Sequence, residues 1–467
     1  MNALGKDLAN LIDSIRVKTD PEDLMAYASD ALHYYHPHRP DAVVLPRSTD
    51  EVSRILRYAS LHQIPVTPRG AGSGLSGAAT PSHGGIVLDM KQMSRILEID
   101  RKNMTATVEP GAVTGRFHHA VEKLNMFYPP DPQSMTVCTI GGNVATRAGG
   151  PRGVKYGTTG NYVTGLDVVL PDGSIIRTGG KFVKQSVGYD LTHLMTGSEG
   201  TLGVITGVTL RLLPLPATNR TVFVTCETLD QAAEIVSEVI ARGSVPAMLE
   251  FLMNLAVMVM NNYITPPAAV DAGAYLLIEF DGDETQVAAD CRRIEEVCYE
   301  MKAREVRVIE NEAEAASYWT ARSKLYPLIN TIYKRAVSED VTVPRSRIPD
   351  FVRAIQQISA EVGVGIGIAG HAGDGNIHPT ILCNELGPEM DAKTNAAIAR
   401  IIRDGLRLGG TISGEHGIGL HKAEFLAEEM DAATISLMRR IKQAFDPLGI
   451  MNPGKIWMEE GAKHAAS

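Results

Sequence analysis

The cysteines of this chain lack the spacing of an iron–sulfur protein. Its 467 residues include five cysteines, and no two are separated as Cys-x-x-Cys: Cys138, Cys226, Cys291, Cys298 and Cys383. An ordinary cluster is held by four thiolates at characteristic spacings, so this chain cannot hold one by itself. We interpret the five residues as reduced core thiols, which indicates a reducing, cytoplasmic environment.

The chain also lacks an excess of positive charge and a long apolar run. It has 45 Lys and Arg against 54 Asp and Glu, a net charge of −9. That balance argues against a nucleic-acid partner, which is recognised through clustered cations. The N-terminus mixes charged and apolar residues, so it predicts neither a signal peptide nor an integral membrane segment. Apolar residues from Leu4 to Ile15 recur at helical spacing instead.

The length of the chain and the changes in its composition predict more than one domain. Residues 1–37 are expected to be helical. From 38 to 216 the chain is dense in glycine, with short β-rich runs and one clear helix at Thr49–His62. Two prolines in LLPLPAT (212–218) indicate a boundary, and 217–413 alternate between strands and helices. A last segment covers 414–467. The pattern predicts an α+β fold without regular βαβ alternation.

A first glycine-rich loop, PRGAGSGLSGAA (68–79), contains Gly72, Gly74 and Gly77 at the spacing of a dinucleotide fingerprint. In a Rossmann fold that turn must open a helix. Here Pro81 and Gly84 follow almost at once, which leaves no room for a helix. The loop can still present several N–H groups to a pyrophosphate. On this loop alone, an anion cradle and a ligand-free surface loop are equally good interpretations.

Two further glycine-rich segments favour the cofactor interpretation. Residues 128–160 (YPPDPQSMTVCTIGGNVATRAGGPRGVKYGTTG) are poor material for a core and well suited to wrapping an extended cofactor. GSEGTLGVIT (197–206) runs from a turn into an apolar strand. Three such segments in one chain predict a large bound cofactor.

These three motifs, in this order, resemble the FAD-binding half of the vanillyl-alcohol-oxidase superfamily. Within it they are similar to the branch of FAD-linked D-2-hydroxyacid dehydrogenases, which includes D-lactate dehydrogenases and glycolate oxidase subunits. The resemblance covers about residues 38–457. It implies a two-subdomain FAD-binding domain, an α+β substrate domain with an antiparallel sheet, and a C-terminal segment, with NPGK at 452–455, that returns to the FAD domain.

The resemblance also implies which residues line the FAD. They are Arg69, Gly70, Ala71, Gly72, Ser73, Gly74, Leu75, Pro130, Ser134, Gly141, Gly142, Asn143, Thr146, Glu199, Val204, Ile205 and Asn452. Relatives with FAD linked to a histidine commonly carry that histidine where this chain has Ser73. The expectation is therefore non-covalent FAD.

A second constellation suggests a metal. In VGIGIAGHAGDGNIHPTIL (364–382), two apolar runs flank a Gly-Asp-Gly-Asn turn signal, so His371 and His378 are expected on a hairpin. Neighbouring strands could bring them to one ion, although two polar residues flanking a turn explain them equally well. In TISGEHGIG (411–419), Glu415 and His416 lie between glycines. The alternative there is an exposed charged loop.

Both segments match the same dehydrogenase branch, which assigns roles to them. The resemblance makes His371, His378 and Glu415 the metal ligands, His416 the catalytic base, and Arg322, in YWTARSKLYP, the arginine that binds the substrate carboxylate. Zinc suits two histidines and a carboxylate, and iron(II) or manganese suit them almost as well. Where 2-hydroxyglutarate enzymes have a further lysine, this chain has Ser338 or a neighbour, with Lys334 upstream.

The expected function is FAD-dependent, metal-assisted oxidation of a small D-2-hydroxy acid, D-lactate or glycolate. The electrons would pass to an electron-transferring flavoprotein or an iron–sulfur subunit, and contact with a membrane would be peripheral, through that partner. Alternatives are a non-catalytic flavin subunit of a larger redox complex and a D-2-hydroxyglutarate-type dehydrogenase. A metallohydrolase would leave the glycine-rich segments unexplained, and an alkylglycerone-phosphate synthase-like enzyme would need more basic clusters.

Overall fold

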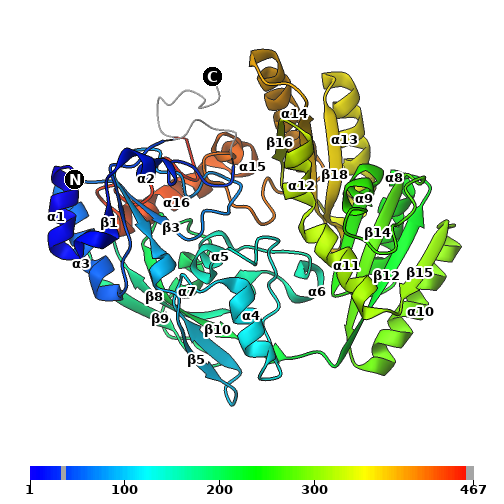
Figure 1. Cartoon of the computed structure of the whole chain (residues 1–467), viewed down its shortest axis with the longest axis horizontal. Coiled ribbons are helices and arrows are strands. Elements are labelled where there is room, and N and C mark those ends of the chain that lie inside the picture. Colours follow the sequence, from blue (N-terminus) through cyan, green and yellow to red (C-terminus); the bar gives the residue numbers. More distant parts are fainter. Residues whose placement is uncertain (33–37, 459–467) are drawn as a thin grey trace. The chain divides into compact units, whose positions relative to one another are not determined.

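The computed structural model describes residues 1–32 and 38–458, and the chain divides into two compact units (Figure 1). The first unit contains Met1–Ala148, Thr158–Leu215 and Glu415–Ser467, and the second contains Gly149–Gly157 and Pro216–Gly414. Residues 33–37 of the expected helical segment and 459–467 of the expected C-terminal segment lie outside the described residues. The chain therefore leaves the first unit twice, and the sequence carried no signal for the short passage at 149–157.

One sheet of the first unit places the first glycine-rich loop. Its order is β1-β2-β4-β3, formed by β1 (Val17–Lys18), β2 (Ala42–Val44), β4 (Ile86–Asp89) and β3 (Val66–Arg69). β2, β4 and β3 run parallel. Helix α3 (Thr49–His62), with the bounds that the sequence predicted, joins β2 to β3 and is capped by Ser48. The glycine-rich loop follows the carboxyl end of β3, the edge at which ligands bind in parallel sheets.

The N-terminal segment is less helical than its apolar spacing predicted. Helix α1 (Ala3–Leu11) ends before Ile15, whose side chain is 80% exposed. The chain then forms β1, in which Val17 pairs with Val44. The expectation of a helix through this stretch was wrong because pairing with β2 outweighs the local periodicity.

A second sheet of the first unit is antiparallel, with the order β5-β6-β10-β8-β9. Its strands are β5 (Ile96–Asp100), β6 (Thr105–Val108), β10 (Val204–Arg211), β8 (Val163–Val169) and β9 (Ile175–Gly179). A short pair, β7 (Met126–Phe127) with β11 (Leu213–Pro214), and the helices α4 (Thr114–Glu122), α5 (Ile140–Thr146) and α7 (Leu191–Met195) accompany it. Helix α2 (Pro21–Met25) instead packs on the first sheet through Leu24, which contacts Val43 and Val87. The third glycine-rich segment leads directly into its central strand, β10.

The second unit is built on an antiparallel sheet with the order β15-β12-β14-β13-β18-β19-β16, and β17 pairs with β19. The strands are β15 (Glu305–Ile309), β12 (Thr218–Cys226), β14 (Ala274–Gly282), β13 (Met248–Met253), β18 (Gly365–His371), β19 (Asn376–Cys383), β16 (Arg335–Ser338) and β17 (Val341–Thr342). An α+β architecture with antiparallel sheets is thus confirmed.

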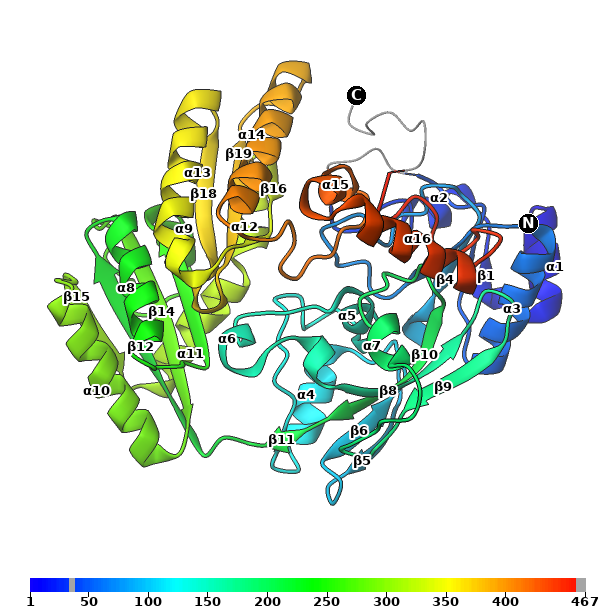
Figure 2. The same cartoon turned by 180° about the vertical axis from the view of Figure 1, so that it is seen from behind.

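Helices cover both faces of this sheet (Figures 1 and 2). One face carries α9 (Asn254–Met260), α11 (Glu312–Ser323) and α12 (Leu325–Ile332), and the other carries α8 (Leu229–Ala241), α10 (Glu284–Glu300), α13 (Ile348–Val362) and α14 (Pro388–Arg407). Because both faces are covered, β12, β13 and β14 are buried along most of their length. Within residues 1–32 and 38–458, no helix has the length and apolar character needed to cross a membrane.

The short passage 149–157 is fastened to the second unit. Its helix α6 (Gly153–Tyr156) brings Lys155 Nζ to 2.5 Å from Asp281 Oδ1 and the Tyr156 hydroxyl to 2.8 Å from Asp281 Oδ2. A Cβ atom on Gly153 would collide with the carboxylate of Asp374. The passage therefore packs on the turn between β18 and β19, next to the first of the two histidines.

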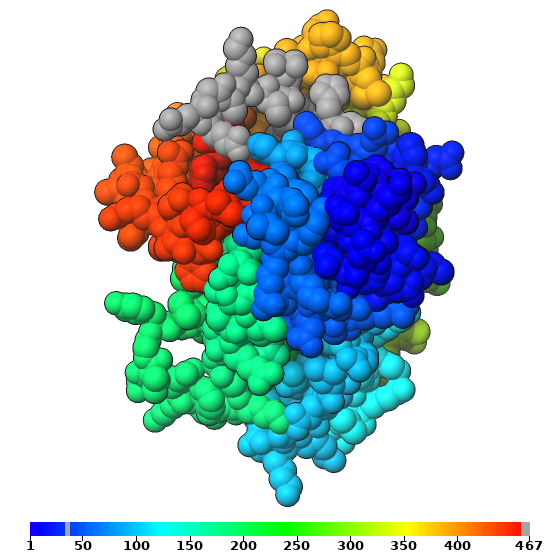
Figure 3. Space-filling view, turned by 90° about the vertical axis from the view of Figure 1, so that its left-hand side faces the viewer, coloured from blue at the N-terminus to red at the C-terminus, as the bar shows by residue number. Residues whose placement is uncertain are grey.

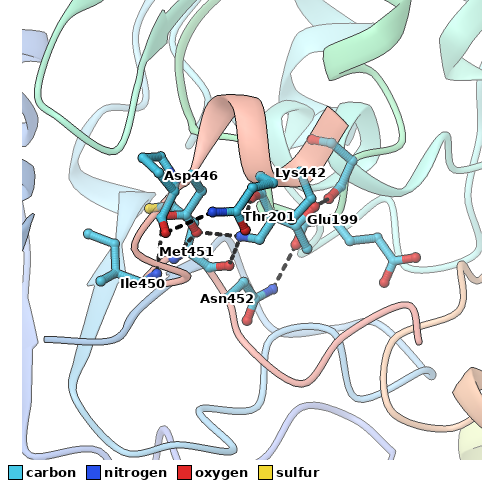
Figure 4. Close-up of polar contacts among 10 residues, drawn as sticks. Glu199, Thr201, Lys442, Asp446, Ile450, Met451 and Asn452 are labelled. Atoms are coloured by element: carbon cyan, nitrogen blue, oxygen red, sulfur yellow. Dashed lines mark hydrogen bonds and ion pairs between the residues drawn. The ribbon is translucent and has the colours of Figure 1, made fainter. Parts of the chain in front are cut away.

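The C-terminal segment, which includes α15 (Leu426–Glu429) and α16 (Ala432–Phe445), is held in the first unit by a largely buried ion pair (Figure 4). Lys442 Nζ lies 2.5 Å from Asp446 Oδ2 and donates to the carbonyl oxygens of Thr201 and Met451. The Asp446 carboxylate also accepts the amide protons of Ile450 and Met451. Burial lowers the pKa of Lys442, so the ammonium depends on Asp446 to remain charged.

The stretch after β9 projects from the first unit as a surface loop, seen in green in Figure 3. Its apolar side chains are almost fully in solvent, with Val183 98%, Val187 82% and Tyr189 94% exposed. Apolar groups gathered on a surface are typical of segments that contact other molecules.

The two partners of the buried ion pair should differ in what their loss costs. Asp446→Ala leaves the Lys442 ammonium without its counter-charge and two amides without an acceptor. We expect it to lower the free energy of unfolding by roughly 3–5 kcal/mol. Lys442→Met keeps the apolar stem and leaves the carboxylate with two amide donors, so its loss should be smaller. Urea unfolding of the full chain measures the loss of stability in both variants. Equal losses of stability, or a larger loss for Lys442→Met, would contradict the view that the Lys442 ammonium depends on Asp446.

Candidate functional site

Arg69 supports the first glycine-rich loop from inside. Its Nη1 donates to the carbonyl oxygens of Ser29 at 2.8 Å and Ala79 at 3.2 Å, and a Cβ on Gly72 would collide with the guanidinium. Gly72 also has φ +70°, which favours glycine. Within the described residues, the N–H groups of 71–76 donate no hydrogen bond to the chain. They are therefore available to an anion, as an FAD pyrophosphate requires.

A buried carboxyl group lies beneath this loop. Asp30 is 3% exposed, accepts the amide proton of Leu32 at 3.0 Å, and faces Gly74. Burial raises the pKa of Asp30 to about 6, against the opposing effects of the Leu32 amide and the Arg69 guanidinium. The predicted contact residues from Gly70 to Leu75 thus form the outer surface of a loop whose inner side is filled by Arg69 and Asp30.

The second glycine-rich segment contains a helix that its composition did not predict. Thr139 caps α5 by accepting the amide proton of Gly142. Gly141 packs so closely on Pro110 that its Cβ would lie 2.5 Å from the proline Cβ. Asn143 donates to the Thr114 hydroxyl at 2.8 Å. Gly141 and Asn143 therefore have packing roles, while the start of α5 places main-chain N–H groups beside the first loop, where Gly70 abuts Thr139.

Three other predicted cofactor residues in this region make hydrogen bonds within the chain. The carbonyl oxygen of Pro130 accepts a hydrogen bond from His118 Nε2 at 2.9 Å. The carbonyl oxygen of Ser134 accepts the amide protons of Val137 and Cys138, and Thr146 donates to the carbonyl oxygen of Gly142. Their assignment to the cofactor remains a prediction.

The third glycine-rich segment and Asn452 of the C-terminal segment meet beside the first loop. Val204 and Ile205 begin β10 and pair with β8. Asn452 donates from Nδ2 to the carbonyl oxygen of Glu199 (Figure 4) and to that of Ala78. Its Oδ1 and the Ser76 hydroxyl are buried without a hydrogen-bond partner in the described part of the chain. Orphaned polar atoms next to unpaired main-chain donors fit a bound cofactor better than a ligand-free loop.

In the second unit, the predicted hairpin is present. β18 and β19 flank a single short turn, and the register pairs Ala369 with His378 and His371 with Asn376. His371 and His378 are therefore diagonal neighbours on one face, with ring centroids 5.0 Å apart. Their ligand atoms and one of Glu415, the residue directly after this unit, all lie within 4.8 Å of one another.

Both imidazoles are oriented through Nδ1. His371 Nδ1 lies 2.5 Å from Glu250 Oε1, and His378 Nδ1 donates to the carbonyl oxygen of Glu339 at 3.2 Å. Each contact fixes the proton on Nδ1 and leaves Nε2 as the nitrogen suited to a metal. Two imidazole nitrogens and a carboxylate, with this outer support, fit zinc, iron(II) or manganese.

Glu250 is a buried residue of this region that sequence analysis missed. It has no solvent exposure and lies in β13, where the pairing of Phe251 with Gly370 puts it opposite His371. Its Oε2 lies 2.6 Å from Arg322 Nε and 2.5 Å from Arg322 Nη2. Burial opposes its charge, but Arg322 and His371 outweigh burial and lower the pKa of Glu250. A charged residue inside the apolar run MLEFLM was the available signal.

Arg322 is buried, unlike an arginine on the surface of a helix. It is 3% exposed, near the end of α11, and its Nε and Nη2 are committed to Glu250. The pairing leaves Nη1 outside the contact. One buried carboxylate thus joins the predicted substrate-binding arginine to a predicted metal ligand.

The segment before His416 is fixed on the second unit. Thr411 pairs with Thr342 of β17, and the Ser413 hydroxyl donates to Asp340 at 2.8 Å. A Cβ on Gly414 would collide with the Thr342 hydroxyl. Glu415 and His416 follow this tight approach, so the glycines around them permit the bent path that the sequence required.

Comparison with known proteins assigns the chain to a family. Residues 40–179 match the family described as "FAD binding domain", and residues 215–456 match "FAD linked oxidases, C-terminal domain". The chain belongs to the FAD-linked oxidases. The predicted family resemblance is thus confirmed.

Similar proteins span nearly the whole of this FAD-linked oxidase. It is 44% identical to the "Glycolate oxidase subunit GlcD" of Bacillus subtilis (strain 168), over 95% of this chain and 94% of that protein. It is 36% identical to the protein of the same name from Escherichia coli (strain K12), over 95% and 89%. It is 35% identical to a "D-lactate dehydrogenase" of Anaerostipes hadrus, over 92% of each.

Solved structures of low sequence identity share the fold. p-Cresol methylhydroxylase with bound substrate aligns with a TM-score of 0.82 at 19% identity, over 98% of this chain and 97% of that one. Alkyldihydroxyacetonephosphate synthase aligns with a TM-score of 0.76 at 19% identity, over 97% and 86%. The fold of this FAD-linked oxidase is therefore of the vanillyl-alcohol-oxidase type, as predicted.

Glu250→Gln tests the support of the histidine pair in this oxidase. The amide loses the charge that orients His371, so zinc affinity should fall roughly 10–100-fold with FAD content unchanged. Zinc retained after equilibrium dialysis measures the affinity. Glu279→Gln, a buried carboxylate on the neighbouring strand β14, is the matched control. Equal zinc retention in the two variants would mean that Glu250 does not support a metal site.

Proposed function

We propose that this FAD-linked oxidase converts a small D-2-hydroxy acid, D-lactate or glycolate, to the 2-oxo acid with the help of a metal ion. The observation that carries the proposal is the buried chain from Arg322 through Glu250 to His371. It couples a carboxylate-binding group to a ligand set for a metal, which are the two features needed to hold a 2-hydroxy acid by its carboxylate and hydroxyl oxygens. The names of the similar proteins support the same substrate class.

The chain supplies binding and proton transfer. Arg322 binds the substrate carboxylate through the part of its guanidinium that Glu250 does not use. His416 accepts the proton of the C2 hydroxyl, a role that suits an imidazole near neutral pH. FAD, when bound, would supply the acceptor for the two electrons and the hydrogen that leave C2. A metal held by His371, His378 and Glu415 would act as a Lewis acid toward the hydroxyl oxygen.

The residues at the expected position of the further lysine favour a small substrate. Ser338 of β16 is buried and contacts the Thr380 hydroxyl at 3.3 Å, and Lys334 is exposed. Neither offers a second buried cation for a dicarboxylate. A D-2-hydroxyglutarate-type reaction is nevertheless the second candidate, because the chain is 32% identical, over 96% of each protein, to a "D-2-hydroxyglutarate dehydrogenase" of Xanthomonas citri pv. viticola.

The electrons must leave the flavin through another molecule. All five cysteines are buried and unlinked, and their spacing cannot ligate an iron–sulfur cluster. We therefore propose an electron-transferring flavoprotein or an iron–sulfur subunit as the acceptor.

Anaerobic titration tests the reaction. Absorbance near 450 nm is followed while D-lactate, L-lactate, glycolate and D-2-hydroxyglutarate are added in turn. Bleaching by D-lactate or glycolate, lost on chelation and restored by zinc, supports the proposal. Bleaching by D-2-hydroxyglutarate alone favours the second candidate. A yellow protein that no 2-hydroxy acid bleaches would indicate a non-catalytic flavin subunit.

Arg322→Lys should weaken substrate binding. A lysine ammonium cannot pair with Glu250 and a substrate carboxylate through a planar fork, so we expect KM to rise by roughly ten-fold or more. FAD content should not change, since Arg322 belongs to the second unit. Arg307→Lys, which alters an arginine paired with Glu314 in the same unit, is the control. Similar KM values for both variants would remove Arg322 from the substrate site.

His416→Gln should stop flavin reduction without loss of the flavin. Glutamine keeps polarity but cannot accept the hydroxyl proton, so the rate of anaerobic bleaching should fall by at least about 100-fold. His193→Gln, in α7, should bleach at the normal rate. Bleaching of the His416 variant at the wild-type rate would show that another group is the base.

A further inference from the structure

The buried side chain of Glu199 is aimed at the loop that carries His416. Glu199 is 6% exposed, and its two carboxylate oxygens each accept one amide proton, from Ile418 and from Gly419, both at 2.8 Å. Gly417, with φ +81°, passes so close that a Cβ there would lie 2.9 Å from Glu199 Oε1. A carboxylate that accepts two successive amides fixes the direction of the chain as well as its distance.

The backbone of Glu199 is itself rigidly held. Its N–H donates to the carbonyl oxygen of Ala145 in α5 at 2.8 Å, and its carbonyl oxygen accepts from Asn452 Nδ2 at 2.7 Å. Glu199 has φ +51°, a conformation that glycine adopts more cheaply, by roughly 1–2 kcal/mol. Glycine would suit this backbone better, so what glutamate contributes here is its side chain.

A second contact fastens the same loop to the first glycine-rich loop. The amides of Leu420 and His421 both donate to the carbonyl oxygen of Ser76, at 2.8 and 3.1 Å. Glu199 and Ser76 therefore hold the successive residues 418–421, all within the first unit. His416 lies two residues before the first of them, so its backbone position follows from where Glu199 holds Ile418.

We propose that Glu199 is a positioning residue for His416, through its two hydrogen bonds to the loop that follows the histidine. This role rests on the proposed function only in that His416 is the base there. Loss of the two bonds would let the imidazole shift, and a displacement of about 1 Å at a catalytic group can cost roughly 100-fold in rate. The resemblance counts Glu199 among the FAD-lining residues, but both of its carboxylate oxygens bond the amides of Ile418 and Gly419. The cofactor would therefore stay bound, because the main-chain donors of the glycine-rich loops are unchanged.

Glu199→Gln is the first test. The amide keeps one acceptor but turns an NH2 toward the other main-chain donor. We expect a normal FAD-to-protein ratio, a substrate KM within about three-fold of wild type, and anaerobic bleaching per bound flavin slowed roughly 10–100-fold. Glu51→Gln is the control, since Glu51 also holds a loop by accepting the Arg47 amide at 2.7 Å, and its side chain pairs with Arg16. A fold-stabilising role alone would lower FAD content and leave the rate per bound flavin unchanged, which would overturn the proposal.

A double variant tests whether Glu199 acts through His416. If Glu199 acts through His416, adding Glu199→Gln to His416→Gln should cause no further loss of rate. Independent losses that multiply would overturn the proposal.

Hydrogen exchange tests the contact without any substrate. Amides of 415–420 should exchange at least roughly ten-fold faster in Glu199→Gln than in Glu51→Gln. Unchanged exchange would overturn the proposal. Faster exchange in a protein that no 2-hydroxy acid bleaches would support the contact and place the failure in the proposed reaction.

Discussion

The buried charge of Glu250 is the constraint on which the second unit depends. A carboxylate with no exposure is strongly disfavoured unless opposite charge and hydrogen bonds compensate for its lost hydration. Arg322 and His371 provide that compensation, and each comes from a different element, α11 and β18. One side chain in β13 thereby fixes a helix, a hairpin and an imidazole tautomer relative to one another. A purely apolar sheet centre would pack as well but would leave those groups free to rotate.

The first unit has a different requirement: its main-chain N–H donors must face a ligand and stay out of hydrogen bonds within the chain. Its first glycine-rich loop is filled from within by Arg69 and Asp30, so the N–H groups face outward. Buried atoms such as Asn452 Oδ1 have no partner in the described residues. A loop of this kind is incomplete as a hydrogen-bonding structure until a polar ligand binds, and binding energy therefore also stabilises the loop.

Much of this architecture could be predicted from the sequence because its signals are local. The Ser48 cap and apolar spacing define α3, and the Gly-Asp-Gly-Asn turn defines the hairpin of the two histidines. The glycine-rich loops and the residues around His416 were also recognisable as motifs.

What could not be predicted depends on contacts between distant residues. Glu250 and Arg322 are 72 positions apart, and nothing near either residue indicates its partner. Helix α5 forms in a segment rich in glycine because the Thr139 cap and the packing of Gly141 on Pro110 offset its poor propensity. Near the N-terminus the reverse occurs: the apolar spacing predicts a helix as far as Ile15, but the chain instead forms β1, which pairs with β2.

The division of the chain has a consequence for synthesis on the ribosome. Except for 149–157, the second unit is one continuous stretch that ends at Gly414, so it can begin to fold while the remaining residues are still being translated. The first unit cannot, because Lys442, Asp446 and Asn452 must reach back to loops translated hundreds of residues earlier. The half translated first is therefore completed last.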